Sequence, residues 1–364
     1  MNFKILTSLS ILLPTLLSSP AHATFAEEAE VEAVMDKAVD QAIRPAYHAF
    51  SGKAADMATA MESLCKENSQ PAFENARNTF DALVRAWSQA EVLRDGPVIR
   101  ENRFERIFFY PDRKSIGLKQ VQALLAVKDK DAIDLATMDQ KSVALQGIGT
   151  EEYILFGKGS EELAAGQENY RCQAGLAVAK NVENLANQLT EAWDDPDGIQ
   201  KDWKKPGPDN AVYRDGEEAL SGLLGVLVRG VETIRDKRIA VFYNPDDGYS
   251  NAKKAALWRS NNTFASIAGN LEGLQDYWLN SGMRHIIKGD ATAITTNITF
   301  DFKTAIKTAE SFGKTPVADV LKDKNLKHKF EFLMMTLEDL QTRLNNDYGR
   351  AMGLGASFTF SDGD

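Results

Sequence analysis

Residues 220–234 read LSGLLGVLVRGVETI and predict the fold class. Apolar side chains recur there every three or four residues, which is the period of one face of an α-helix. Similar stripes run from Phe264 to Trp278 and from Leu326 to Leu344. Each spans about 15 to 20 residues, a length typical of helices packed in bundles. Alternating strand patterns are scarce, so the sequence predicts an all-α fold of packed helical bundles.

Turn-forming residues interrupt the helical pattern near the middle of the chain. They cluster from Asp194 to Gly198 and from Lys204 to Pro208, where the apolar stripe stops. We place a linker at residues 196–208, between an N-terminal bundle over residues 24–195 and a C-terminal bundle over residues 209–364. A second turn is expected at residues 244–248.

A short echo suggests that the two bundles arose by internal duplication. Asn78-Thr79-Phe80 and Asn262-Thr263-Phe264 both open apolar helical patterns about half a chain apart.

Residues 1–23 have the pattern of a signal peptide. Lys4 precedes an apolar run from Ile5 to Leu17, and Ala21-His22-Ala23 has the form of a cleavage site. Cleavage after Ala23, with Ala26 as the second choice, predicts a protein of the Gram-negative periplasm. The run is too short for a membrane span, and no other window holds about 18 uninterrupted apolar residues, so we expect no membrane-spanning segment.

Charge and cysteine content restrict the chemistry further. The formal net charge is −10 at pH 7 and no long Lys/Arg run is present, whereas a nucleic-acid groove needs a basic stripe. We expect no nucleic-acid partner. Cys65 and Cys172 are predicted to form a disulfide, because an even count in an oxidising compartment favours pairing. Two free buried thiols are the alternative.

Residues 147–157, GIGTEEYILFG, place two carboxylates and three glycines in an apolar helical segment. A buried carboxylate needs a cation, a metal or several hydrogen-bond donors. Gly149 and Glu152 share one helical face, whereas Glu151 lies roughly 100° away. We therefore predict that Glu152, rather than Glu151, is the partly buried and functional acid. A solvated helix end carrying both acids is the alternative.

Arginines upstream are candidates for the counter-charge of Glu152. Arg100, Arg103 and Arg106 recur at three-residue steps, and Arg113 follows. If helical, the first three would line one side of a helix, and guanidinium groups suit carboxylates or anionic ligands. Arg103, Arg106 and Arg113 are thus predicted to form a cleft wall. The alternative is a solvated face paired with neighbouring glutamates.

A second candidate wall consists of Trp87, Glu91 and Arg94, which share one helical face at positions i, i+4 and i+7. The alternative is an intrahelical ion pair between Glu91 and Arg94 beside a core tryptophan. Motifs of zinc peptidases, serine hydrolases and phosphate-binding loops are absent. His328 and Glu331 have ligand spacing, but flanking lysines indicate a solvated face. No catalytic residue is assigned.

Residues 147–157 resemble the signature of the imelysin-like family of bacterial envelope proteins, Gly-x-His-x-x-Glu followed by apolar residues and a closing Gly. Gly147 and Glu152 match, and Gly149 stands where the family has histidine. The resemblance extends over most of the mature chain through Arg44-Pro45-Ala46-Tyr47, Ala86-Trp87-Ser88-Gln89-Ala90-Glu91, Gly96-Pro97, Phe108-Phe109-Tyr110-Pro111-Asp112 and Asn270-Leu271-Glu272-Gly273-Leu274.

The resemblance implies two related helical bundles packed face to face, a metal site at the His and Glu of the signature, and a link to bacterial iron uptake. Glycine has no ligand atom, so Gly149 leaves a carboxylate set that suits hard cations. Glu152 is then the expected ligand for iron or another divalent cation.

These expectations combine into one functional hypothesis. It is a periplasmic binding or accessory protein for iron, another metal or a metal chelate, with an envelope iron-transport system as partner and its site in the cleft between the bundles. The ligand-binding residues expected are Gly147, Gly149, Glu152, Trp87, Glu91, Arg94, Arg103, Arg106 and Arg113. An imelysin-type metallopeptidase is the alternative.

Overall fold

The structure, a computed structural model, describes residues 26–165, 170–288 and 291–354. Helices dominate these ranges, which confirms the all-α prediction. The predicted signal peptide lies outside them. The helices of the first half are α1 (Glu28–Lys37), α2 (Arg44–Glu67), α3 (Gln70–Ala90), α4 (Arg103–Ile107), α5 (Ile116–Val127), α6 (Leu135–Met138), α7 (Ile148–Phe156), α8 (Tyr170–Asp194) and α9 (Ile199–Lys204).

The second half contains α10 (Gly216–Thr233), α11 (Thr263–Asn280), α12 (Thr292–Glu310), α13 (Val317–Lys322), α14 (Lys324–Thr342) and α15 (Gly349–Ala351). Two short strands, β1 (Tyr243–Asn244) and β2 (Tyr249–Ser250), pair antiparallel around the turn expected at residues 244–248. None of the helices in the described ranges is long and apolar enough to cross a membrane.

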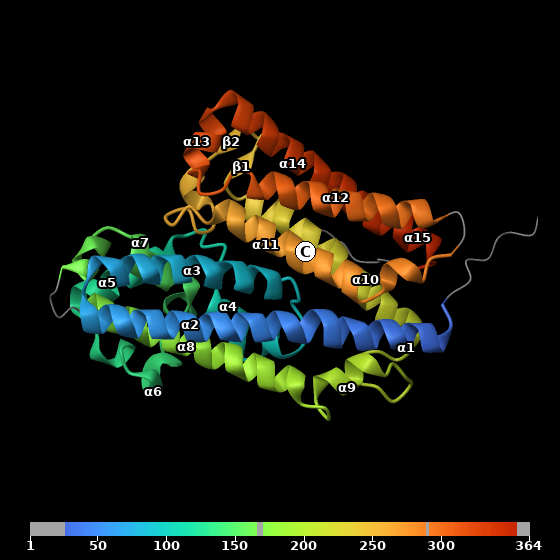
Figure 1. The fold of residues 1–364 in the computed structure, drawn as a ribbon, viewed down its shortest axis with the longest axis horizontal. Coiled ribbons are helices and arrows are strands. Elements are labelled where there is room, and N and C mark those ends of the chain that lie inside the picture. Colours follow the sequence, from blue (N-terminus) through green and yellow to red (C-terminus); the bar gives the residue numbers. More distant parts are fainter. Residues whose placement is uncertain (1–25, 166–169, 289–290, 355–364) are drawn as a thin grey trace, which may run out of the picture.

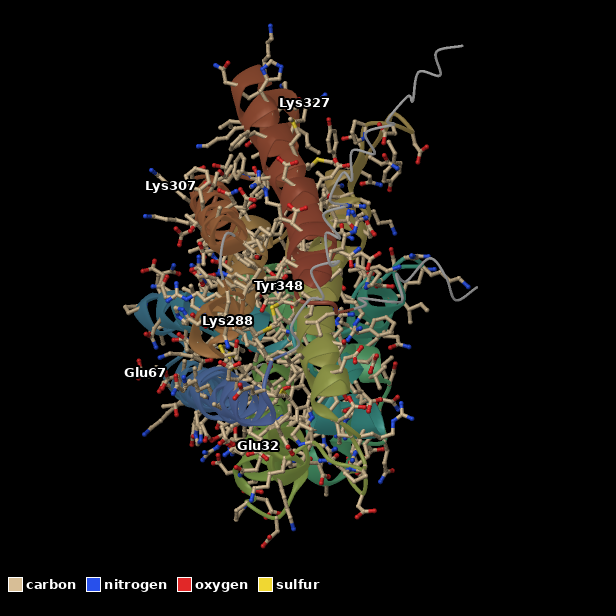
Figure 2. The ribbon with its side chains drawn as sticks, turned by 90° about the vertical axis from the view of Figure 1, so that its right-hand side faces the viewer. Glu32, Glu67, Lys288, Lys307, Lys327 and Tyr348 are labelled. Carbon is tan, nitrogen blue, oxygen red and sulfur yellow. A yellow bond between two sulfur atoms is a disulfide. The ribbon has the colours of Figure 1, made fainter. Side chains whose placement is uncertain are left out.

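The long helices form two layers (Figure 1). In the first half α2 packs against α3 and α8, and in the second half α12 packs against α11 and α14. The layers meet where α3 lies along α11. One hydrophobic cluster extends through both layers, from Ala26 to Leu354. Figure 2 shows Tyr348 inside the second half, where it is fully buried, while Lys307 and Lys327 point outward.

Local sequence sets the helix boundaries. The α2 helix ends at Asn68, which adopts a left-handed conformation with φ of 48°, and asparagine tolerates that region better than most residues. Ser69 then caps α3, because its hydroxyl accepts a hydrogen bond from the Ala72 amide at 3.3 Å. Pro71 lies in the first turn of α3, where its fixed φ suits the helix and its missing N–H leaves no hydrogen bond unmade.

The contact between α3 and α11 depends on close backbone approach. A Cβ atom at Gly273 would overlap the carbonyl oxygen of Gln89, so only glycine fits there. The Asn270 side chain donates to the Ser88 carbonyl oxygen at 2.7 Å, and Arg85 forms an ion pair with Glu272. Two of the sequence blocks that carry the family resemblance, residues 86–91 and 270–274, therefore face each other across this contact.

The predicted disulfide between Cys65 and Cys172 is confirmed, and it joins α2 to α8 with a Cα–Cα distance of 5.5 Å. The predicted linker contains α9, whose Trp203 is fully buried and packs edge-on against Trp193 at 5.5 Å. Residues 78–80 lie inside α3, whereas Thr263 begins α11. The domain boundaries and the internal duplication stay predictions.

Candidate functional site

The short helix α7 carries both Glu151 and Glu152 and is enclosed by other helices. It packs against α3, α5 and α8, so its faces are buried on several sides. Gly147, which precedes α7 as its N-cap, has no room for a side chain, because a Cβ atom there would overlap the carbonyl oxygens of Arg106 and Ile107. Glu151 is 1 % exposed and Glu152 is 4 % exposed. The predicted burial of Glu152 is confirmed, and the expectation that Glu152 rather than Glu151 is the buried acid is wrong, because both are buried.

Glu152 is held by the loop that precedes α11. Its Oε1 accepts hydrogen bonds from the Ser260 amide at 3.0 Å and from the Ser260 hydroxyl at 2.9 Å. The guanidinium of Arg259 lies 3.9 Å from Oε2. Burial raises the pKa of Glu152 above its ordinary value, and the Ser260 hydrogen bonds and the Arg259 charge oppose that rise.

Glu151 has no such support. Its carboxyl group lies against Gly175 of α8, where a Cβ atom would sit 3.6 Å from Oε1. Neither oxygen has a hydrogen-bond partner among the described residues. Burial alone raises the pKa of Glu151 well above its ordinary value, so the acid stays protonated over a wider pH range than an exposed glutamate.

A cavity of about 130 Å³ lies beside Glu152, and we call it the Glu152 cavity. Gly147, Gly149 and Glu152 line it on the α7 side, as predicted. A Cβ atom at Gly149 would meet nothing within 4 Å. The position at which the family signature has histidine therefore faces open space, and a Cβ atom fits there without a clash. The opposite wall consists of residues 253–259, which come from the second half of the chain.

Positive charge and aromatic rings dominate the Glu152 cavity. Lys253, Lys254 and Arg259 line it, and the Arg259 guanidinium lies over the Trp258 ring at 4.5 Å. Its second carboxylate, Asp112, accepts hydrogen bonds from the amides of residues 116 and 117 at 2.7 and 3.0 Å. Both acids therefore accept hydrogen bonds from the protein, and three cationic side chains face them; the Lys254 ammonium group donates to the Arg113 carbonyl oxygen at 2.8 Å, and neither lysine is paired with the acids. The site favours an anionic ligand.

The predicted arginine wall does not line this cavity. The expectation that Arg100, Arg103 and Arg106 share a helical face is wrong, because Arg100 is extended and Glu101 has φ of 55°, which breaks the helix. Arg106 donates to Gln146 at 2.7 Å. Arg103 pairs with Glu101 at 2.9 Å, and Arg113 is exposed. Arg259 provides the charge next to Glu152 instead.

The second predicted wall is divided between the core and another cavity. Trp87 is 1 % exposed and packs between Phe50 and Phe104. Glu91 and Arg94 line a separate cavity of about 100 Å³ at the junction of the two halves. The buried partner of Glu91 is Arg238, not Arg94.

Sequence reasoning missed the loop that completes the Glu152 cavity. Trp258, Arg259 and Ser260 lie about 100 residues from Glu152, so no local spacing connects them. The available signal was the run Trp258-Arg259-Ser260-Asn261-Asn262, which combines an aromatic, a cation and turn-forming asparagines before a helix. Left-handed conformations at Leu257 and Asn261 shape this loop.

The donor set around Glu152 does not fit a resident metal ion. The described residues contain no group of three or more His, Cys, Asp or Glu side chains that could hold one. One carboxylate that accepts two hydrogen bonds and faces a guanidinium is a poor ligand, since hard cations take several oxygen ligands. Glu152 as a metal ligand stays a prediction that this geometry does not favour.

Comparisons with known proteins agree on one family. Residues 43–344 match the family model described as Imelysin. An imelysin-like protein from Psychrobacter arcticum 273-4 superposes with a TM-score of 0.72 at 14% identity, over 91% of this chain and 98% of its own. A Parabacteroides distasonis ATCC 8503 protein, named as an iron-regulated protein A precursor, has a TM-score of 0.72 at 15% identity, over 90% and 96%. No curated protein sequence matches the chain.

Proposed function

Because this chain belongs to the imelysin family, we propose that it is a periplasmic binding or accessory protein of bacterial iron uptake that holds an anionic metal chelate in the Glu152 cavity. The signal-peptide pattern of residues 1–23 supports export. The name of the Parabacteroides neighbour supports an iron context. An envelope transport system is the expected partner.

One observation carries the choice of ligand, namely the charge balance of the Glu152 cavity. Three cationic side chains line it, and the protein itself supplies the hydrogen bonds of both carboxylates. A chelate with free carboxylate oxygens would find guanidinium and ammonium donors there, together with the Trp258 ring as a flat contact. A bare cation would meet like charges. In this proposal Glu152 positions Ser260 and Arg259, and Arg259 contacts the ligand.

Tryptophan fluorescence tests the proposal, because Trp258 is the one tryptophan of the chain that is not fully buried. Ferric citrate, citrate alone, haem and zinc chloride are titrated separately. We expect ferric citrate to quench the emission saturably, and a Trp258→Phe variant to lose that response. A response to none of the iron compounds would contradict an iron-chelate function.

Two substitutions decide the sign of the ligand charge. Arg259→Gln should weaken ferric citrate binding tenfold or more, since losing a hydrogen bond to a charged group costs about 1.5 to 3 kcal/mol. Glu152→Gln should have a smaller effect. Arg214→Gln is the matched control, because Arg214 is exposed and lines neither cavity. Binding of zinc that is abolished by Glu152→Gln and tightened by Arg259→Gln would show that the site is built for cations.

The peptidase hypothesis has a separate test. Protein purified without chelator is analysed for metal and assayed for peptide cleavage with and without added zinc. Stoichiometric zinc together with chelator-sensitive cleavage would replace the binding function by hydrolysis.

A further inference from the structure

The second cavity, which we call the Arg238 cavity, lies where the end of α3 meets α10 and α11. It shares no lining residue with the Glu152 cavity. We propose that the Arg238 cavity binds a small oxyanion that carries its own hydroxyl group, such as hydrogen phosphate or a hydroxycarboxylate. The proposal is independent of the function assigned to the Glu152 cavity.

A buried ion pair lies at one wall of the Arg238 cavity. Arg238 is 3 % exposed and its Nη2 donates to Oε1 of Glu91, which also accepts a hydrogen bond from the Asn270 amide at 2.8 Å. The guanidinium packs over the rings of Phe108 and Tyr110 at 5.0 and 5.1 Å. These contacts come from both halves of the chain and fix the position of the pair.

The ion pair leaves one donor and one acceptor without partners. Nη1 of Arg238 and Oε2 of Glu91 are both buried and make no hydrogen bond to any described residue. A buried polar atom without a partner costs about 1 to 3 kcal/mol, and more when the group is charged. A ligand that accepts a hydrogen bond from Arg238 and donates one to Glu91 would satisfy both atoms together.

Two further guanidinium groups give the cavity its preference for anions. Arg94 and Arg229 line it and are exposed, and neither has a carboxylate within 4.0 Å among the described residues. The Arg94 guanidinium lies over the Phe104 ring at 4.3 Å. On α10, residues 226, 229, 230 and 233 share one helical face, which directs Arg229 toward the cavity. Asp95 also lines the cavity, so three guanidinium groups face two carboxylates there, and Asp95 accepts a hydrogen bond from the Gly96 amide at 2.6 Å.

The free acceptor on Glu91 distinguishes between oxyanions. Hydrogen phosphate and hydroxycarboxylates carry an O–H group that can donate to Oε2, whereas sulfate and acetate at neutral pH have only acceptors. Without that donor, the ligand would place a lone pair beside a buried carboxylate oxygen. We therefore expect phosphate to bind more tightly than sulfate, and glycolate more tightly than acetate.

Titration calorimetry of the full chain tests the proposal with sodium phosphate, sulfate, glycolate and acetate at matched ionic strength. The informative comparisons are phosphate with sulfate and glycolate with acetate, because phosphate and sulfate both stabilise proteins non-specifically. We expect at least one hydroxyl-bearing anion to bind tenfold or more tightly than its counterpart. Phosphate alone responding would identify a phosphate-type ligand, and glycolate alone a hydroxycarboxylate. Equal affinities within both pairs would overturn the proposal.

Variants then assign the binding to one cavity. The double variant Arg94→Gln and Arg229→Gln changes two exposed side chains, so it should fold normally, as circular dichroism can verify. It should lower the affinity tenfold or more, whereas Arg214→Gln should leave the affinity unchanged. Arg259→Gln should also leave it unchanged, since Arg259 belongs to the Glu152 cavity. Binding that survives the double variant, or that Arg259→Gln removes, would overturn the assignment to the Arg238 cavity.

Discussion

Replacing Glu151 with glutamine should change how the stability of the protein depends on pH. The Glu151 carboxyl group is fully buried against α8, and no described residue donates a hydrogen bond to it. Burial raises its pKa in the folded protein well above the value of 4.5 for the unfolded chain. The folded state therefore keeps a proton that the unfolded state releases, and a rise in pH favours unfolding.

The size of the effect follows from proton linkage. Between pH 4.5 and the raised pKa of the folded state, each pH unit lowers the free energy of unfolding of the wild type relative to Glu151→Gln by about 1.4 kcal/mol. Below pH 4.5 the difference should be constant, because both states then hold the proton. Above the folded pKa it becomes constant again. Glutamine is a buried unpaired amide, so it adds only an offset that does not vary with pH.

Urea unfolding of both proteins at pH 4, 5, 6, 7 and 8 measures the difference. We expect Glu151→Gln to gain stability relative to the wild type from pH 5 upward. Glu151→Met, which removes the polar group, should show the same pH slope with a different offset. Parallel stability curves for the wild type and both variants would refute the conclusion that the folded protein holds Glu151 in its neutral form.

Four further predictions concern α7 and the disulfide. Gly147→Ala should lower the free energy of unfolding by about 1 to 3 kcal/mol or more, because its methyl group would overlap the α4 backbone. Gly149→Ala, where the added methyl group meets open space, should instead raise the free energy of unfolding by up to about 1 kcal/mol. If urea unfolding showed that both alanine variants change stability in the same direction, the difference in space at the two glycines would be contradicted. The double variant Cys65→Ala and Cys172→Ala should lower the free energy of unfolding by about 4 to 5 kcal/mol in the chain-entropy model. A loss below one tenth of that free energy in urea unfolding would rule out a stabilising cross-link. Gly149→His should fold, because a Cβ atom there meets nothing within 4 Å, but His and Glu152 are only two ligands beside Arg259, so calorimetry should detect no stoichiometric zinc binding; zinc binding that adding Glu152→Gln removes would contradict the conclusion that Glu152 is a poor metal ligand.

The sequence alone was sufficient for the helical architecture. Stripes such as Leu220 to Ile234 repeat at the helical period because one face of each long helix is buried. The same reasoning was wrong for α7, where it assumed a single buried face. Three neighbouring helices enclose α7, so adjacent positions 151 and 152 are both buried.

The candidate site was only half predictable. Gly147, Gly149 and Glu152 are adjacent in sequence and were identified, whereas Arg259 and Ser260 reach them through tertiary packing. The same limit applies to Glu91, whose partner Arg238 is on a different helix in the other half of the chain. Local patterns favoured the nearer Arg94 and the series beginning at Arg100, and two left-handed residues, Glu101 and Asn102, disrupt that series.

The glycine-tight contact between α3 and α11 has a consequence for ligand entry. Backbone atoms of Gln89 and Gly273 already touch, and Arg85 and Glu272 fasten the same contact. A hinge motion that separates the two halves would have to break this contact between α3 and α11. Under the proposed function, we therefore expect a ligand to enter beside residues 253–259, the wall of the Glu152 cavity opposite α7, without separation of the two halves.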